Sequence, residues 1–357
     1  MSAGARSRVV QEDVAALCDA ASDALRELSA TTVLVTGGAG FLPSYLVDAL
    51  AHANDTLLDE PCRIICVDNY LTGSASRVAH LEGRSDVRFV EHDLTQPLSL
   101  DEPVDHVVHG ASIASPIWYR RYPLETIDVN VSGTRHLLDL AVADAARSFV
   151  YLSSSEIYGD PPREQIPTSE DFWGHVSSTG PRACYDESKR LAETLCMTYH
   201  RLHGLPVRLV RPFNVYGPRL RLDDGRIVPD LIRDALDGKP LVLYSDGRAT
   251  RSFCYIGDFV AALPHLMRSD VPSGPYNVGN DEEITIRECA EIVDALSDEP
   301  QGIRFEVSDD TQYLTDNPQR RCPDLTKTKS TIPWQPQVMA REGLARTLAS
   351  YQEQEPT

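Results

Sequence analysis

The amino-acid sequence predicts an α/β fold in which a doubly wound parallel sheet is accompanied by a smaller, partly interleaved C-terminal domain. Short, continuously apolar runs recur over the first 217 residues, as in strands that are buried on both faces. Stretches in which apolar residues recur at helical spacing lie between these runs. Beyond Gly217 the pattern becomes irregular, which indicates a second region of different construction.

The expected elements follow from these two periodicities, taken in chain order. Strands are predicted at residues 32–36, 63–68, 87–93, 106–111, 148–155 and 207–217. Helices are predicted at residues 10–28, 41–53, 124–143, 187–203, 228–236, 286–295 and 341–351. We expect residues 1–30 to form a helical extension and residues 31–217, with 250–278, to form the sheet domain. Residues 218–249 and 279–357 then make up the smaller domain.

The composition excludes several classes of function. The chain has 357 residues, with 34 basic and 53 acidic side chains and a net charge of −19, so bulk electrostatics disfavour nucleic acid or anionic lipid as a partner. Its eight cysteines form no C-x-x-C pair, and no Cys/His cluster has zinc spacing, so we expect free thiols and no metal site. No apolar run approaches the roughly 20 residues that a membrane span requires. We therefore expect a cytoplasmic protein without a membrane segment.

A glycine-rich turn follows the first predicted strand. Gly37, Gly38 and Gly40 lie between this strand and a helix, which is the Rossmann-like arrangement for a dinucleotide pyrophosphate. Asp68 ends the second strand, where a carboxylate accepts hydrogen bonds from the adenosine ribose and repels the extra phosphate of NADP. The pattern thus predicts NAD as the cofactor. Pro43 stands where a third glycine is usual, and its ring takes up space between helix and strand.

A second motif carries the chemistry. Tyr185 and Lys189 are four residues apart on one face of a predicted helix, and chance alone would produce only about 0.16 such pairs in this chain. A nearby ammonium, together with a nicotinamide's positive charge, lowers a tyrosine pKa so that the phenol accepts a proton from a sugar hydroxyl. Ser154, at the end of the fifth strand, is placed to bond the same oxygen. The alternative is an ordinary surface pair on an amphipathic helix.

From residue 32 onward the chain resembles an extended short-chain dehydrogenase/reductase of the nucleotide-sugar-modifying group, and within it the UDP-glucuronate decarboxylases (UDP-xylose synthases). The motifs that carry the resemblance are ASP (114–116), SSSEIYGDP (153–161), SEDFWGHVSSTGPRACYDESKRLAE (169–193), RPFNVYGPR (211–219), DDGRIV (223–228), TRSFCYIGD (250–258) and RRCPDLTK (320–327).

The resemblance implies a role for each matching residue. Tyr185 is expected to be the base that drives oxidation at sugar C4, with Lys189, Ser154 and Glu156 beside it, and Arg321 to approach the sugar carboxylate. The residues expected to hold NAD are Gly37, Gly40, Phe41, Leu42, Asp68, Asn69, Asp93, Leu94, Ala111, Ser112, Asn130, Tyr185, Lys189 and Pro212. Those expected to hold the nucleotide sugar are Ser115, Pro116, Tyr119, Ser155, Asn214, Arg219, Arg226, Tyr244, Arg251 and Arg321.

The resemblance also implies a reaction. Related 4,6-dehydratases carry an Asp-Glu pair after the catalytic serine or threonine, and the aspartate expels the C6 hydroxyl; here that position is Ser155. Once C4 of a hexuronate is a ketone, the C6 carboxylate belongs to a β-keto acid and leaves as CO₂ without such an acid. We therefore expect NAD-dependent conversion of UDP-glucuronate to UDP-xylose through a UDP-4-keto intermediate. Relatives pair through a four-helix bundle, here residues 124–143 and 185–203, so a homodimer is expected.

Several alternatives remain open on the sequence. A 4,6-dehydratase, a 4-epimerase and a non-catalytic protein that senses NAD redox state share parts of the pattern. Ile113, Ala249 and Cys322 replace residues that are usual in the resembled family, on the substrate side of the site. The sequence leaves open whether the main product is the pentose or its 4-keto form. It also leaves the nucleotide, UDP or another, undetermined.

Overall fold

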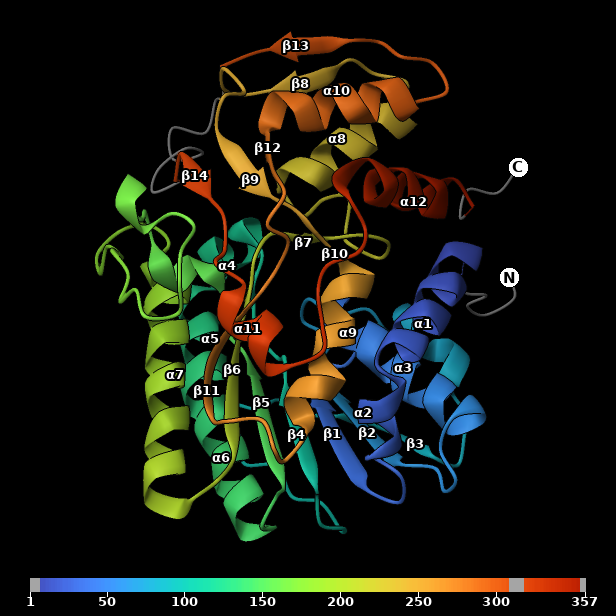
Figure 1. Cartoon of the computed structure of the whole chain (residues 1–357), viewed down its shortest axis with the longest axis vertical. Coiled ribbons are helices and arrows are strands. Elements are labelled where there is room, and N and C mark those ends of the chain that lie inside the picture. The colour runs from blue at the N-terminus through green and yellow to red at the C-terminus, as the bar shows by residue number, and fades with distance from the viewer. Residues whose placement is uncertain (1–6, 308–317, 354–357) are drawn as a thin grey trace.

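A seven-stranded parallel sheet forms the base of the molecule (Figure 1). The computed structural model describes residues 7–307 and 318–353; parts of the predicted helical extension (1–6) and of the predicted smaller domain (308–317 and 354–357) lie outside these ranges. The strand order is β11-β6-β5-β4-β1-β2-β3, and every neighbouring pair is parallel. The strands are β1 (Thr32–Thr36), β2 (Arg63–Asp68), β3 (Val87–Glu91), β4 (His106–His109), β5 (Ser148–Leu152), β6 (Val207–Pro212) and β11 (Gly274–Val278). This arrangement confirms the predicted fold class.

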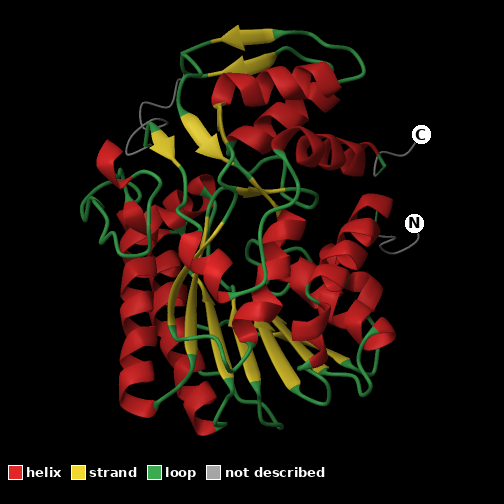
Figure 2. Cartoon of the chain, in the orientation of Figure 1, coloured by secondary structure: helices red, strands yellow, loops and turns green. Residues whose placement is uncertain are grey.

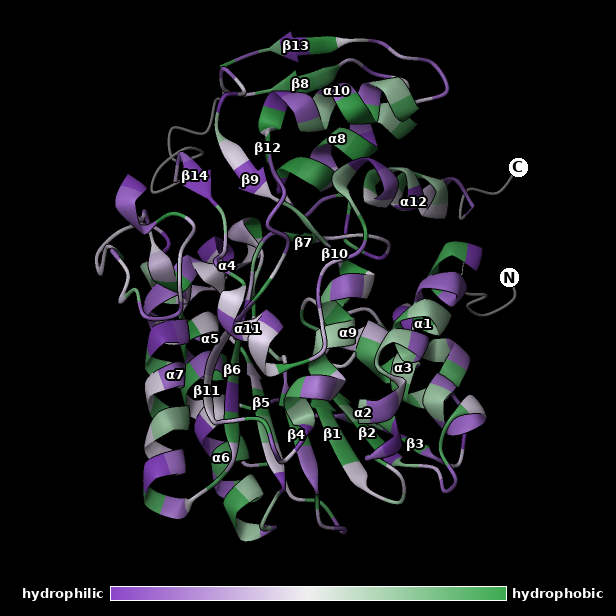
Figure 3. Ribbon diagram, viewed as in Figure 1, coloured by the Kyte–Doolittle hydropathy of each residue, from purple (hydrophilic) through white to green (hydrophobic). Residues whose placement is uncertain are grey.

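Helices cover both faces of this sheet because successive strand residues point to opposite faces. On β1, Val33 and Val35 face one core, and Leu34 faces the other. The first core is closed by α1 (Arg8–Ala20), α2 (Ser22–Arg26), α3 (Phe41–Thr56) and α9 (Ile256–Met267). The second is closed by α6 (Thr134–Ala143) and α7 (Ala183–His203), with α5 (Pro123–Asp128) beside them (Figure 1). Figure 3 shows the matching hydrophobic colouring along the central strands.

The upper part of the molecule is built from helices and short strands (Figure 2). Its helices are α8 (Ile227–Leu236), α10 (Ile286–Leu296) and α12 (Ala340–Gln352). The strands are β8 (Leu241–Leu243) with β13 (Ile303–Phe305), and β9 (Thr250–Ser252) with β12 (Glu283–Thr285) and β14 (Arg320–Arg321). β7 (Val215–Tyr216) and β10 (Cys254–Tyr255) pair between the two parts. The chain returns to the large sheet as β11, while the exact domain boundaries stay a prediction.

Short helices complete the described chain. α4 (Pro116–Arg121) and α11 (Thr326–Thr331) are each six residues long. Single turns of 3₁₀-helix occur at Ala75–Arg77, Ala79–Leu81, Ser155–Tyr158 and Arg163–Gln165. Within the described residues, no helix is both long and apolar enough to cross a membrane.

Three predicted elements are interrupted in the structure. The first helix, predicted at 10–28, breaks at the buried Ala21 into α1 and α2. The helix predicted at 124–143 passes through a π-helical turn at Val129–Gly133, where the Thr134 hydroxyl donates to the Asn130 carbonyl. The strand predicted at 207–217 ends at Pro212, because Asn214 has φ of 41° and turns the chain out of the sheet into β7. The last two interruptions occur at Asn130 and Asn214, two residues that the sequence predicts at the functional site.

Candidate active site

A cavity of about 670 Å³ lies between the sheet and the upper part of the molecule. It is lined by the start of α3, the ends of β5 and β6, the start of α7, and residues of β7, β9 and β14. The carboxyl edge of a parallel sheet is the usual ligand site of this architecture. The cavity therefore lies where the sequence motifs predict a cofactor and a substrate.

The glycine turn is tightly packed at one end of this cavity. Gly37 has φ of 66°, and a Cβ atom on it would lie 2.7 Å from the Cα of Ala111. Gly40 precedes the first residue of α3, so the N-terminal amides of a sixteen-residue helix are directed to the cavity, which Phe41 and Leu42 line. Pro43 fits within the first helical turn because its ring packs where Gly110 has no side chain. A residue with a side chain is excluded at 37 and at 110.

The Asp68 side chain holds the glycine turn through a hydrogen bond to its backbone. Its carboxylate accepts hydrogen bonds from the backbone N–H of Ala39 (3.0 Å) and of Tyr70 (2.8 Å). Burial raises the pKa of Asp68, and these two bonds oppose the rise. A Cβ atom on Gly73 would come within 2.8 Å of both carboxylate oxygens. Asp68 thus holds the turn in shape, in addition to the ribose contact that the sequence predicts.

Tyr185 and Ser154 meet in the middle of the cavity. Tyr185 is buried near the start of α7, and its side chain is hydrogen-bonded to that of Ser154. The Tyr119 ring stacks on the Tyr185 ring with centroids 5.2 Å apart and planes 12° apart. Burial raises the pKa of Tyr185 to about 12, and the bond to Ser154 acts in the opposite direction. The phenol therefore needs a positive charge nearby before it becomes an effective base.

Lys189 lies one helical turn beyond Tyr185 and is almost wholly buried. Its Nζ donates to the Leu152 carbonyl at 2.7 Å and lies 5.9 Å from the centre of the Tyr185 ring. Burial lowers the pKa of Lys189 to about 7, which the carboxylate of Glu193 opposes. A lysine with this pKa changes its charge near neutral pH and so responds to any charge placed in the cavity.

A carboxylate held between two arginines forms the other half of the site. Glu156 accepts hydrogen bonds from Arg182 and from Arg321, and Arg251 is close enough to influence its ionisation. Burial opposes ionisation of Glu156, but Arg182 and then Arg321 lower its pKa to about 2. Burial and the neighbouring Arg321 lower the pKa of Arg251 to about 10, so it remains charged at neutral pH. We call Glu156, Arg182, Arg251 and Arg321 the arginine cluster.

Three further residues that the sequence predicts to bind the substrate, Arg226, Ser115 and Asn214, are held by contacts with neighbouring residues. Arg226 pairs with Asp224, whose backbone carbonyl accepts a hydrogen bond from the Ser115 hydroxyl at 2.9 Å. Asn214 donates through Nδ2 to the Ser252 carbonyl at 3.2 Å. The Ser115–Asp224 contact joins the start of α4 to the loop before α8.

The structure brings most of the predicted residues to this cavity. Those that line it are Gly40, Phe41, Leu42, Ser112, Ser115, Pro116, Tyr119, Ser154, Ser155, Glu156, Tyr185, Lys189, Pro212, Asn214, Arg226, Tyr244, Arg251 and Arg321. Residues predicted to bind the cofactor that are not among the lining residues are Gly37, Asp68, Asn69, Asp93, Leu94, Ala111 and Asn130. Asp93 is exposed and accepts a hydrogen bond from the Thr95 amide.

Arg219, which the sequence predicts to hold the substrate, is not among the described residues that line the cavity. Its guanidinium donates to the fully buried Asp48 of α3 at 2.7 Å and lies 5.1 Å from the centre of the Tyr45 ring. Arg219 has φ of 71°, and the next two residues, Leu220 and Arg221, line the cavity. Arg219 thus connects the loop after β7 to α3 through Asp48. The sequence motif alone does not reveal this contact between distant segments.

Comparison with known proteins agrees with this geometry. Residues 33–279 match the NAD dependent epimerase/dehydratase family. The chain belongs to this family. It is 43% identical over 312 residues to UDP-glucuronic acid decarboxylase 6 of Arabidopsis thaliana, covering 87% of this chain and 86% of the relative. It is 41% identical over 324 residues to UDP-glucuronic acid decarboxylase 1 of Danio rerio, covering 91% and 73%.

Solved structures of the family show the same fold. A crystal structure of UDP-glucuronic acid 4-epimerase from Bacillus cereus, in complex with UDP-glucuronic acid and NAD, superposes with a TM-score of 0.75. The two sequences are 25% identical, and the match covers 91% of this chain and all of that one.

The residues at the glycine turn fit the NAD of this family. The backbone approaches closely at Gly37 and Gly40, as a pyrophosphate requires, and the α3 N-terminus provides its partial positive charge. Farther along, the Ser112 hydroxyl and the Asn130 carbonyl oxygen are buried without a hydrogen-bond partner among the described residues. A polar ligand in the cavity would supply partners of the kind that such buried atoms require.

Arg182 is the residue of the arginine cluster that the sequence motifs did not predict. It precedes α7 directly and lies three residues before Tyr185, so both side chains point to the same side of the helix. That spacing is the signal that the sequence contained. Its contact with Glu156, 26 positions earlier in the chain, depends on how the loop between β5 and α7 folds back.

Proposed function

We propose that this protein catalyses the NAD-dependent decarboxylation of UDP-glucuronate to UDP-xylose through a UDP-4-keto intermediate. The observation that carries the proposal is the arginine cluster beside Tyr185 and Ser154 in one cavity. Three guanidinium groups around one carboxylate leave an excess of positive charge, which suits a sugar that bears a carboxylate. The relatives named as UDP-glucuronic acid decarboxylases support the same substrate.

In this proposal, Tyr185 removes the proton from the sugar 4-hydroxyl while Ser154 hydrogen-bonds the same oxygen. NAD held at the glycine turn and the α3 N-terminus would supply a hydride acceptor for C4 and a hydride donor for the final reduction. Lys189 provides positive charge close to the phenol, and the stacked Tyr119 ring keeps the phenol in position. The 4-keto uronate is a β-keto acid, so the C6 carboxylate leaves as CO₂ and C5 is then protonated.

The arginine cluster has a further part in the proposed reaction. Arg321 and Arg182 meet at Glu156, so their positive charge beside Tyr185 and Ser154 would hold the substrate carboxylate. Glu156 remains ionised over the neutral range because its pKa is about 2. Its negative charge limits how tightly the arginines hold the substrate carboxylate, which must lose its charge to form CO₂. Uniformly tight binding of that carboxylate would oppose the reaction.

Ser155 favours decarboxylation over dehydration. It lines the cavity next to Glu156, at the position where the resembled dehydratases have the acid that expels the C6 hydroxyl. A serine hydroxyl is a much weaker acid than a carboxyl group. A 4-epimerase is the second candidate, since a UDP-glucuronic acid 4-epimerase shares this fold and its own substrate is also a uronate.

We also propose that the protein acts as a homodimer through a four-helix bundle. Leu124 and Ile127 on α5 and Leu191 on α7 are exposed apolar side chains, and α5 packs along α7 (Figure 1). Two copies of this face would cover these side chains. A cytoplasmic location is part of the same proposal, supported by eight cysteines that are all free thiols.

The proposed reaction is tested with UDP-glucuronate labelled with ¹³C at the carboxyl carbon, in the presence of NAD. We expect labelled CO₂ and a UDP-pentose, with any UDP-4-keto-pentose resolved by mass spectrometry. UDP-glucose and dTDP-glucose are offered in parallel, since a dehydratase converts these to 4-keto-6-deoxy sugars. Retention of the label in a UDP-hexuronate isomer would identify an epimerase instead. If no substrate is consumed and no CO₂ is released, the proposal is wrong.

A further inference from the structure

The N-terminal helix α1 carries a buried carboxylate at its centre. Asp13 is 4% exposed, while its neighbours Val10, Val14 and Leu17 pack into the main hydrophobic core. A carboxylate in such surroundings is costly unless charged and polar groups satisfy it. The groups that do so come from other elements.

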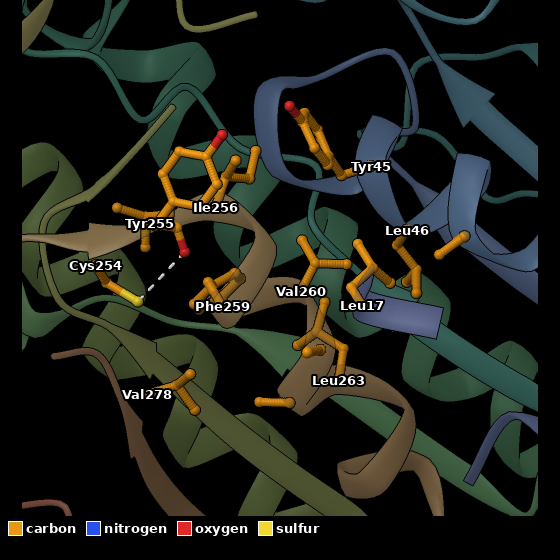
Figure 4. Close-up of a cluster of buried hydrophobic side chains, with 14 of the residues drawn as sticks. Leu17, Tyr45, Leu46, Cys254, Tyr255, Ile256, Phe259, Val260, Leu263 and Val278 are labelled. Atoms are coloured by element: carbon orange, nitrogen blue, oxygen red, sulfur yellow. Dashed lines mark hydrogen bonds between the residues drawn. The ribbon is translucent and has the colours of Figure 1, made fainter. Parts of the chain in front are cut away.

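Four hydrogen bonds converge on this carboxylate. Tyr255 of β10 donates from its hydroxyl at 2.7 Å, and Tyr45 of α3 donates at 3.4 Å. Arg346 of α12 donates through Nε at 3.0 Å and Nη2 at 2.7 Å. We call Asp13, Tyr45, Tyr255 and Arg346 the Asp13 hub. Figure 4 shows the Tyr45 and Tyr255 hydroxyls pointing to the same edge of the apolar cluster that includes Leu17.

The hub joins both parts of the molecule. α3 is the helix that begins at the glycine turn, whereas α12 packs on α8 and α10 in the upper part. β10 pairs with β7, so that Tyr255 lies beside Tyr216 in register, with ring centroids 5.8 Å apart. The Tyr216 hydroxyl in turn donates to the Ala340 carbonyl at the start of α12, at 3.3 Å.

β7 is at the same time a wall of the cavity. Asn214, Val215 and Tyr216 line it, as do Gly40 and Phe41 at the start of α3. The position of this wall relative to the glycine turn therefore depends on the contacts that connect β10, α12 and α3. Asp13 is the residue to which all three elements donate hydrogen bonds.

We propose that Asp13 is a positioning residue for nucleotide-sugar binding, acting through Tyr255 and Arg346 on the cavity wall formed by β7. The proposal rests on the proposed function for the identity of the ligand, a UDP-sugar. It extends that function by assigning a role to the N-terminal helix, which none of the sequence motifs reaches. Loss of the carboxylate charge leaves Arg346 without its main partner and weakens the hold on β10 and α12.

The test replaces Asp13 by asparagine, which keeps the size but removes the charge, and measures UDP affinity by calorimetry. Asp19→Asn on the exposed face of the same helix is the matched control. We expect the UDP dissociation constant and the KM for UDP-glucuronate to rise about tenfold in Asp13→Asn, as for loss of one charge-assisted hydrogen bond. The kcat and the NAD content should remain at the wild-type values, and Asp19→Asn should match the wild type throughout. Tyr255→Phe removes one hydroxyl from the hub and serves if Asp13→Asn does not fold.

Amide hydrogen exchange makes the test independent of the ligand's identity. We expect faster exchange at residues 214–216 and at the start of α12 in Asp13→Asn without any ligand. Unchanged exchange there, or UDP affinity within twofold of the wild type despite a lower Tm, would show that α1 serves only for packing and would overturn the proposal. If the wild-type protein itself does not bind UDP, the proposed function fails, and the exchange measurement alone then decides whether Asp13 positions the wall.

Discussion

Tyr185 lies in surroundings that disfavour its ionisation, whereas the Tyr185–Lys189 motif by itself suggests that ionisation is favoured. The sequence predicts that Lys189 lowers the tyrosine pKa, whereas in the structure burial raises it to about 12. Burial also lowers the pKa of Lys189 to about 7, so the ammonium is only partly present at neutral pH. A cationic nicotinamide bound beside Tyr185 would stabilise the phenolate and so lower the pKa of the phenol. In the proposed reaction, proton removal by Tyr185 would then depend on the oxidised cofactor.

Replacing Tyr185 by phenylalanine tests this assignment. We expect kcat to fall about 10³-fold, the scale of a lost general base, while the NAD content stays unchanged because the ring and its stacking on Tyr119 are kept. Steady-state release of CO₂ and the absorbance of bound cofactor measure the two quantities. Tyr122→Phe, on a ring stacked with Trp118 nearby, is the control and should retain activity. A Tyr185→Phe variant with near wild-type kcat would contradict the assignment.

Glu156 offers a pH-dependent test at the same scale. Its pKa falls from 4.5 to about 2 on folding, so its ionised form stabilises the folded protein above pH 4.5 and this contribution is lost as the pH falls towards 2. We expect Glu156→Gln to lower the free energy of unfolding by about 2 kcal/mol at pH 7, because two arginines lose their shared partner.

The difference between Glu156→Gln and the wild type should shrink steadily below pH 4.5. Denaturant unfolding at pH 7, 5 and 3.5 measures it, with the exposed Glu164→Gln as control. A destabilisation that is independent of pH would contradict the claim that ionised Glu156 stabilises the folded protein.

At the scale of elements, helices α5 and α7 present apolar side chains that the chain itself leaves uncovered. Leu124 is 69% and Leu191 47% exposed on the two helices. The loop before α7 also brings Arg182 to Glu156. In our proposal, α7 carries both the catalytic pair Tyr185 and Lys189 and the dimer face. Association of two chains along α7 would hold its start, and with it Tyr185, in place.

Charged substitutions on this face test the proposed dimer. We expect Leu124→Asp combined with Leu191→Asp to shift the mass in light scattering from a dimer to the 39.5 kDa of a single chain. Met339→Asp, at an exposed apolar residue before α12, should leave the mass unchanged. A dimer that persists in the double variant would place the interface elsewhere.

At the scale of the whole molecule, the net charge of −19 contrasts with a site for an anionic ligand. The contrast is resolved locally, because Arg182, Arg226, Arg251 and Arg321 gather from four separate segments around one cavity. Arg219, expected among them, instead ties the loop after β7 to Asp48 of α3. Arginines are therefore gathered at the cavity where we propose that the ligands bind, and Arg219 connects the loop after β7 to α3.

Ligand binding across both parts should stabilise the whole fold. At a UDP concentration one hundred times its dissociation constant we expect about 2.7 kcal/mol of stabilisation and a Tm rise of about 4 °C. Arg226→Ala, which weakens binding about tenfold, should lose about half of that rise at the same UDP concentration. Differential scanning fluorimetry measures both, with Arg233→Ala on the outer part of α8 as control. An equal Tm rise in Arg226→Ala would exclude Arg226 from the nucleotide site.

The sequence by itself determined the fold class, the bounds of β1 and β2, the glycine turn and the Tyr185–Lys189 pair. These are local features: strand and helix periodicity, backbone freedom at glycine and spacing along one helix depend on residues close together in the chain. The tertiary structure alone decided the partners of long side chains. Arg321 reaches Glu156 across 165 positions, and Arg346 reaches Asp13 across 333. No periodicity encodes such contacts, because a flexible side chain pairs with whatever charge the packed elements bring within its reach.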